Sequence, residues 1–272
     1  MRLNYFMHKY IIKLNTARNC LKYIVKAYNI KSIYIPYYIC NTVKSALRKE
    51  NVNINFYHID KDFMPVYDFN KNDFILYPNY FGICSKNVEV LEKKYKNLIV
   101  DNAHSFYSKP KGLASFNSLR KFFQPNYGIK NGAYLYSDKI LDNEFETDEN
   151  YQLCEYSFEN IVKNENMLDN ENIKFISETT EIFIKNIDFE QEKQRRISNF
   201  YKYDKLYAKQ NEIKINLTKE DIPFVYPLLT KNENIGYNLE KQGLMIFRYW
   251  EGIPKNFKEY EFYKYLVPIP IY

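Results

Sequence analysis

Three side chains with reactive chemistry lie close together in the chain: Asp101, His104 and Lys121. Asp101 directly follows the apolar run Leu98–Val100, so its carboxylate is expected at the end of a buried strand. There it could hold the N–H of a pyridinium-type ring by a charge-assisted hydrogen bond, and His104 could bond a phenolic oxygen of that ring or stack on it. A lysine in a partly buried pocket near positive charge can lose its proton and form a Schiff base.

An anion site is indicated upstream, where Thr16-Ala17-Arg18-Asn19 opens a predicted helix. The free backbone N–H groups and the positive dipole end of a helix attract anions, and the Arg18 guanidinium can clamp a phosphate. Each feature alone has a simpler explanation. Thr16 would be a plain N-cap, Asp101 a cap of the next helix, and Lys121 a solvated surface charge.

The first half of the chain is predicted to alternate between helices and strands. The predicted helices are Ala17–Tyr28, Asn41–Glu50 and Asn87–Tyr95, and the predicted strands are Ser32–Ile35, Asn53–Ile59, Phe74–Tyr77, Leu98–Val100 and Tyr134–Ser137. This alternation predicts an α/β fold with a mainly parallel sheet sandwiched by helices. In such sheets ligands bind at the carboxyl ends of the strands, where Asp101 is expected.

The second half predicts a different organisation. Ser137–Asn172 is polar and acidic and is interpreted as a connecting region, and Phe175–Leu206 is predicted to be one long helix. Strand-like pieces at Pro223–Leu229 and Leu244–Tyr249 flank a predicted helix at Ile235–Gln242. We therefore expect a large α/β domain over residues 1–170, and a long helix with a small α+β lobe over residues 171–272. The segment Gly128–Tyr136 is predicted to be a turn that feeds a strand.

Composition narrows the class of partner. The net charge of +6 comes from basic residues interleaved with acidic ones, which permits phosphorylated ligands and argues against nucleic-acid binding. No apolar run reaches the roughly 20 residues that span a bilayer, and the N-terminal segment lacks a secretory pattern, so a cytoplasmic protein is expected. The four cysteines, Cys20, Cys40, Cys84 and Cys154, form no C-x-x-C pair, so no metal site is predicted.

Taken in order, these features resemble the DegT/StrS family of PLP-dependent (pyridoxal-phosphate), fold-type I sugar aminotransferases. The resemblance covers most of the chain. Its segments are LNTARNCLKYIVKAYNIKSIYIPYYICNTVKSAL, VDNAHSF, SFNSLRKFFQPNYGIKNGAYLY, RRISNFYKYDKLY, DIPFVYPLL, GLMIFRYW and the closing strand YLVPIPIY. The chain departs from the family in being shorter, and the family's downstream Asn-Tyr-Arg block is not visible, its place being taken by Asn160–Ser177.

The resemblance implies a role for each candidate residue. Lys121 would be the Schiff-base lysine and proton carrier, Asp101 would bind the pyridine nitrogen, and His104 would lie near the ring oxygen. The other implied cofactor contacts are Ala17, Arg18, Asn19, Ser115 and Ser118 at the phosphate, and Cys40 where the family often has a ring-stacking aromatic. Because Ser115 lies one residue farther from Lys121 than usual, Ser118 is expected to take over its phosphate role. Asn79 and Tyr80 are candidates for substrate contact.

The activity implied is transfer of an amino group, most often from glutamate in the family, to a keto-sugar that is nucleotide-linked, in surface polysaccharide or glycan synthesis. A homodimer with sites shared across the interface is implied as well. One alternative is a PLP-fold protein without transaminase activity that acts as a binding or regulatory partner in the same pathway. A second is a glycosyltransferase-like nucleotide-sugar binder, for which Asp60-Lys61-Asp62 fits the D-x-D pattern formally.

Overall fold

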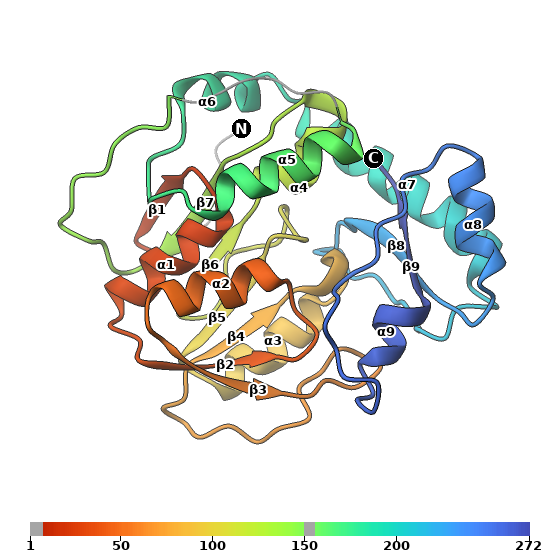
Figure 1. Cartoon of the computed structure of the whole chain (residues 1–272), viewed down its shortest axis with the longest axis horizontal. Helices are drawn as coiled ribbons and strands as arrows, with labels where there is room; N and C mark the ends of the chain where they lie inside the picture. The colour runs from red at the N-terminus through yellow and green to blue at the C-terminus, as the bar shows by residue number, and fades with distance from the viewer. Residues whose placement is uncertain (1–7, 150–155) are drawn as a thin grey trace.

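The computed structural model describes residues 8–149 and 156–272, so the start of the N-terminal segment and Cys154 lie outside the described residues. A seven-stranded sheet runs in the order β1-β7-β6-β5-β4-β2-β3 (Figure 1). Its strands are β1 Tyr10–Leu14, β2 Ser32–Pro36, β3 Asn53–Tyr57, β4 Ile75–Pro78, β5 Leu98–Asn102, β6 Ala114–Asn117 and β7 Ala133–Ser137. Both pairings of β7 are antiparallel, and the other pairings within this sheet are parallel. The predicted α/β fold with a mainly parallel sheet is confirmed.

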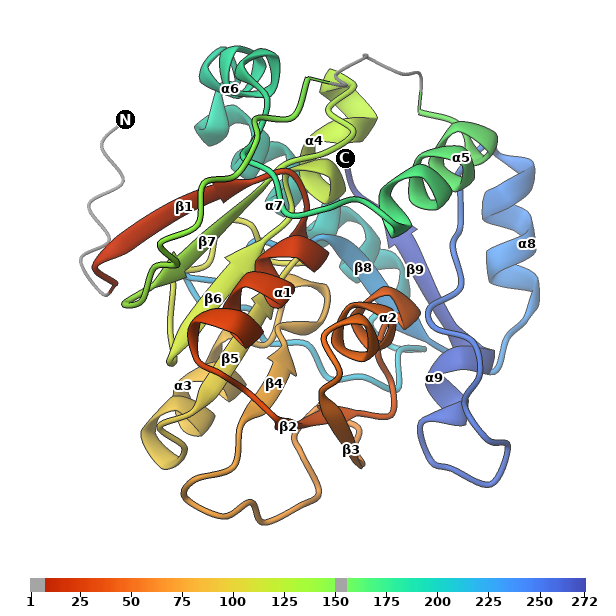
Figure 2. The ribbon, with the colours of Figure 1, turned by 60° about the vertical axis from the view of Figure 1, so that its left-hand side comes forward.

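Helices cover both faces of this sheet (Figure 2). They include α1 Ala17–Ala27 and α2 Asn41–Lys49 on one face, and α3 Ser85–Lys94 on the other. Leu76 and Ile99 pack in the cluster under α1 and α2, whereas Ile75 and Val100 belong to the cluster on the opposite face. Because successive side chains of a strand point to opposite faces, a strand covered on both sides must be apolar at every position. This explains the short continuous apolar runs of β4 and β5.

A smaller unit follows at the C-terminal end. It contains α7 Phe189–Tyr207, α8 Asn234–Lys241 and α9 Tyr260–Tyr265, together with the antiparallel pair β8 Val225–Leu229 and β9 Leu266–Pro270. The predicted strand and helix at β8 and α8 and the closing strand at β9 are confirmed. The division of the chain near residue 170 stays a prediction.

Three sequence-based predictions about elements are wrong. Leu244–Tyr249 is not a strand, because β8 pairs with β9; the Tyr249 carbonyl accepts a hydrogen bond from the Tyr38 hydroxyl instead (2.8 Å). The predicted long helix is two helices, α6 Glu178–Lys185 and α7. The break occurs because the Asp188 carboxylate accepts hydrogen bonds from the backbone N–H groups of Glu190 and Gln191 and so caps a new helix.

The third error concerns Ser137–Asn172, which is more than a connection. It contains α5 Phe158–Asp169, and the Ser157 hydroxyl caps this helix by accepting a hydrogen bond from the Asn160 N–H. Thr147 of this segment also forms an isolated parallel β-bridge with Phe175, which follows the segment. Polar composition hid the helix, although Phe158, Ile161 and Leu168 recur at roughly helical spacing.

The carboxyl ends of several strands meet at one edge of the sheet. Along the chain β3 is added on one side of β2 and β4 on the other, so the direction of strand order reverses there. A crevice at such a reversal is where open α/β sheets bind ligands. No helix in residues 8–149 and 156–272 is both long and apolar enough to cross a membrane.

Candidate active site

A cavity of about 90 Å³ lies at this edge of the sheet and opens to solvent. Segments that follow β1, β2, β4 and β5 line it, together with α5 and α4 Leu119–Tyr127. Eight of the residues proposed from the sequence line it: Ala17, Arg18, Cys40, Asn79, Asp101, His104, Ser118 and Lys121. The fold thus gathers around one space residues that are far apart in sequence.

Lys121 lies in the first turn of α4. Burial lowers the pKa of the Lys121 amine below its usual range, and the nearby Arg120 guanidinium lowers it further. No described residue pairs with its Nζ atom. A lysine with a depressed pKa and a free Nζ can present the neutral amine that attacks a carbonyl.

Asp101 is the last but one residue of β5 and is buried. Its Oδ1 atom accepts a hydrogen bond from the Ala103 N–H (2.8 Å), and no other described group donates to the carboxylate. Burial raises the pKa of Asp101 to about 6, although the Ala103 N–H and Lys121 oppose this rise. The second carboxylate oxygen is therefore able to accept a hydrogen bond from the ring N–H of a ligand in the cavity.

His104 is buried among aromatic rings. Its ring stacks on Phe224 at a centroid distance of 4.5 Å and on Trp250 at 5.6 Å. Burial lowers the pKa of His104 well below its usual value, and Lys121 and Arg120 act in the same direction. A neutral imidazole is therefore expected here at pH 7, with Trp250 beside it in the cavity wall.

The start of α1 forms one wall of the cavity. The Thr16 hydroxyl accepts a hydrogen bond from the Asn19 N–H (3.1 Å), whereas Ala17 and Arg18, the first two helical residues, have no intrahelical acceptor for their N–H groups. Ser118 precedes α4, and its hydroxyl makes no capping hydrogen bond. Free N–H groups and a free hydroxyl are donors that suit a phosphate.

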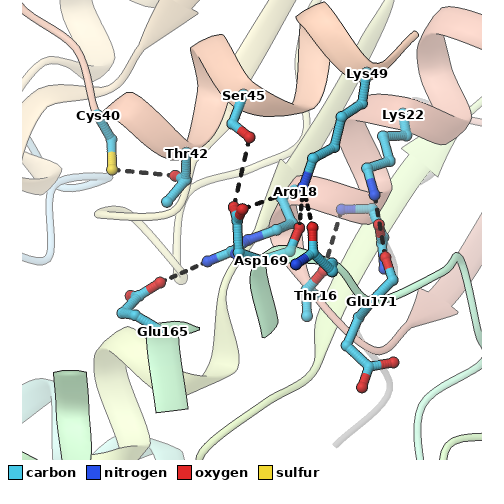
Figure 3. A network of polar contacts seen from close by, with 12 residues as sticks. Thr16, Arg18, Lys22, Cys40, Thr42, Ser45, Lys49, Glu165, Asp169 and Glu171 are labelled. Atoms are coloured by element: carbon cyan, nitrogen blue, oxygen red, sulfur yellow. Dashed lines mark hydrogen bonds and ion pairs between the residues drawn. The ribbon is translucent and has the colours of Figure 1, made fainter. Parts of the chain in front are cut away.

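Two charged residues of the cavity, Glu165 and Arg120, were not assigned a role from the sequence. The Glu165 carboxylate, from α5, forms ion pairs with Arg18 (2.5 Å) and with Arg120 (Figure 3 shows the Arg18 pair). Burial acts to raise the pKa of Glu165, but Arg120, Lys121 and Arg18 outweigh it and lower the pKa to about 2. Only the helical spacing within α5 could have pointed to Glu165, because its partners lie far away in sequence.

Three proposed residues lie outside the cavity lining. The Asn19 side chain donates hydrogen bonds to the Asn15 side chain (2.9 Å) and to the Asn172 carbonyl (2.6 Å), so it fixes the loop after α5 instead of facing a phosphate. Ser115 lies fully buried within β6. Tyr80 is also fully buried, and its hydroxyl donates to the Tyr38 carbonyl (2.9 Å). Their predicted contacts with a ligand stay predictions, because these three residues do not line the cavity.

Cys40 does line the cavity, beside the first turn of α2. Its Sγ accepts a hydrogen bond from the Thr42 hydroxyl (3.1 Å), which orients the thiol (Figure 3). Asp60 lies elsewhere: its Oδ1 accepts the N–H groups of Asp62 and Met64, which is a turn motif. The described residues contain no group of three or more His, Cys, Asp or Glu side chains arranged to hold a metal ion.

Asp101→Asn is expected to stabilise the cofactor-free protein near pH 7. The pKa of Asp101 rises from 3.8 to about 6 on folding, so the folded state loses stability as the pH rises between these values. The loss amounts to about 2 to 3 kcal/mol, and an asparagine, which does not ionise, avoids it. Urea unfolding from pH 4 to pH 7 measures the effect.

The matched control for this prediction is Asp62→Asn, because Asp62 is exposed and its carboxylate is not buried on folding. We expect the Asp101 variant to show a flatter dependence of the unfolding free energy on pH than the native protein or the control. An unchanged dependence would show that Asp101 carries no buried charge at neutral pH.

Comparison with solved structures identifies this architecture. An aminotransferase of the DegT DnrJ EryC1 StrS group from Brucella abortus superposes with a TM-score of 0.64 at 10% identity, over 97% of this chain and 81% of that one. Helicobacter pylori PseC, an aminotransferase of pseudoaminic acid biosynthesis, gives 0.62 at 13% identity over 97% and 81%. The PLP form of Spr1654 from Streptococcus pneumoniae, provisionally described as a sugar aminotransferase, gives 0.68 at 14% identity over 98% and 83%.

The chain has the fold of the PLP-dependent sugar aminotransferases. No family model matches the sequence, and no curated protein does. The resemblance predicted from the sequence is thus confirmed at the level of the aminotransferase fold. Since the identities are 10 to 14%, the activity of this chain must be argued from its own site.

Proposed function

We propose that this protein is a PLP-dependent aminotransferase that moves an amino group, with glutamate as donor, to a nucleotide-linked keto-sugar for surface glycan synthesis. One observation carries the proposal: Lys121, Asp101, His104 and the start of α1 all line a single cavity at the carboxyl edge of the sheet. A homodimer, which the resemblance to the family implies, and a cytoplasmic location complete the proposal.

The residues present fit PLP on three counts. The Lys121 amine is free within the described chain, and its pKa is depressed by burial. The buried Asp101 carboxylate has one oxygen without a donor. The α1 N–H groups, Arg18 and Ser118 supply donors for a phosphate in the same cavity. The cavity thus offers a nucleophile, a ring-nitrogen acceptor and an anion site together.

In the proposed reaction each residue has a defined task. PLP, when bound, supplies an electron sink for the carbanion formed at the reacting carbon. Asp101 holds the ring N–H, and its own orientation is fixed by the Ala103 N–H. Lys121 removes the proton from the α-carbon of the amino donor, and in the second half of the reaction it delivers a proton to the former carbonyl carbon of the sugar. The stacked rings of His104 and Trp250 form an apolar part of the cavity wall beside this proton transfer.

The proposal is tested by the first half of the reaction. Glutamate added to the PLP-loaded protein should give 2-oxoglutarate in an amount equal to the protein, and the absorbance of the cofactor should change with it. Glutamine and aspartate serve as alternative donors under the same conditions. Absence of any keto acid product from all three donors would contradict the proposed aminotransfer.

A specific observation favours a second candidate, a PLP-fold protein without transaminase activity. The Glu165 carboxylate forms ion pairs with two arginines of the cavity, Arg18 and Arg120. Glu165 lies in the segment Asn160–Ser177, which stands in the place of the family's Asn-Tyr-Arg block. In that case PLP would bind to Lys121, but no donor would yield a keto acid. The half-reaction therefore separates the two candidates.

A further inference from the structure

The Glu165 carboxylate bridges two guanidinium groups inside the cavity. Its Oε2 atom contacts Arg18 Nη2 at 2.5 Å, and its Oε1 atom contacts Arg120 Nη2. The Arg18 and Arg120 side chains are only 7% and 12% exposed. Both cations are thus largely shielded from water and directed at the same anion.

The backbone that carries Glu165 is also anchored by contacts that do not involve the Glu165 side chain. One turn farther along α5, the Asp169 carboxylate pairs with Lys49 (3.2 Å) and Arg18 (3.4 Å) and accepts a hydrogen bond from Ser45 (3.5 Å) (Figure 3). The Lys49 amine also donates to the Asp169 carbonyl (2.5 Å). Movement of the Glu165 side chain alone would leave these contacts to α1 and α2 in place.

The position that Glu165 fills is also the position that suits a phosphate. Arginine recognises carboxylates and phosphates with the same planar set of donors. Arg18 belongs to the first turn of α1, where N–H groups without intrahelical acceptors point toward an anion. With its pKa lowered to about 2, Glu165 is ionised at any pH near neutrality, so a phosphate entering here meets a negative charge already in place.

We infer that Glu165 is a resident anion that competes with the cofactor's phosphate for Arg18 and Arg120, and so determines which ligands the site accepts. Because Glu165 is tethered, its effective concentration is high, and a singly charged carboxylate from solution cannot replace it. A doubly charged phosphate ester can, since it also engages the α1 N–H groups. This inference rests on the proposed function, because it takes PLP as the ligand.

The test compares three probes on the protein: PLP, pyridoxal, which lacks the phosphate, and inorganic phosphate. Dissociation constants are measured by absorbance titration for the first two and by calorimetry for the third. The variant is Glu165→Gln, and Glu159→Gln is the matched control, because Glu159 is an exposed carboxylate at the start of the same helix. Thermal unfolding of each variant verifies the fold, and Glu165→Ala repeats the test with a smaller side chain.

Glu165→Gln is expected to bind PLP and inorganic phosphate about tenfold more tightly, with pyridoxal affinity unchanged and the control like the native protein. Equal or weaker PLP binding in Glu165→Gln, or an equal gain for pyridoxal, would overturn the inference, while PLP binding by the native protein would leave the proposed function intact. Tighter inorganic phosphate binding without PLP binding by either protein would support Glu165 as the resident anion and count against PLP as the cofactor.

Discussion

Lys121→Ala should lower the rate of amino transfer from glutamate by about three to four orders of magnitude. The structure gives the reason: the Lys121 amine lies in the cavity, its pKa is depressed by burial and by Arg120, and no described residue pairs with it. The substitution removes both the nucleophile that holds the cofactor and the base that moves the proton. The measurement is the initial rate of 2-oxoglutarate formation with saturating PLP.

Lys130→Ala is the control for this loss. Lys130 lies in the turn after α4 and does not line the cavity, so its replacement should leave the rate within about twofold. Added methylamine provides a second test, because a small amine can take over part of the proton transfer that the Lys121 variant has lost. Full activity of Lys121→Ala would exclude Lys121 from the chemistry and would remove the basis of the proposed reaction.

Arg196→Ala is expected to destabilise the protein by about 3 to 5 kcal/mol. Arg196 is fully buried, and its guanidinium donates to the Phe122 carbonyl (2.8 Å) and to the Phe224 carbonyl (3.2 Å). It also lies over the Phe122 ring, 4.5 Å from the centroid. Phe122 is in α4 next to Lys121, and Phe224 immediately precedes β8, so the side chain ties the lysine-bearing helix to the C-terminal unit.

The measurement is urea unfolding of the cofactor-free protein. Arg196→Lys should recover little of the stability, because an ammonium group lacks the planar fork that reaches two carbonyl groups at once. Lys193→Ala on the same helix is the control; its ion pair with Glu190 is partly exposed, and we expect a loss below about 1 kcal/mol. A similarly small loss for Arg196→Ala would contradict the assigned link between α4 and the C-terminal unit.

Local sequence patterns predicted five of the seven strands of the sheet, whereas β1 and β6 were not predicted. A central strand such as β5 must be apolar at each position of Leu98–Val100, and this run is visible without any knowledge of neighbours. Asp101 then falls at the carboxyl edge by position alone. The same reasoning placed the start of α1, where Thr16 is a recognisable N-cap.

The errors have two causes: a deciding contact that is distant in sequence, or a local feature that hydrophobic periodicity does not reveal. Leu244–Tyr249 has the composition of a strand. However, β8 pairs with β9, and this long-range pairing is not visible in the sequence of the segment itself. The helical pattern continues across the break before α7, and the capping by Asp188 is a local detail that periodicity does not reveal. Glu165 could not be found because its two arginine partners lie in α1 and α4.

The most direct test of the account is the site of covalent attachment. The PLP-loaded protein is reduced with borohydride, digested and analysed by mass spectrometry, so that any imine becomes a stable secondary amine on its lysine. The pyridoxyl-phosphate group is expected on Lys121, with none on that peptide in Lys121→Ala. Stoichiometric labelling of another lysine, or no labelling under conditions in which PLP is in excess, would contradict the claim that this cavity is a PLP site.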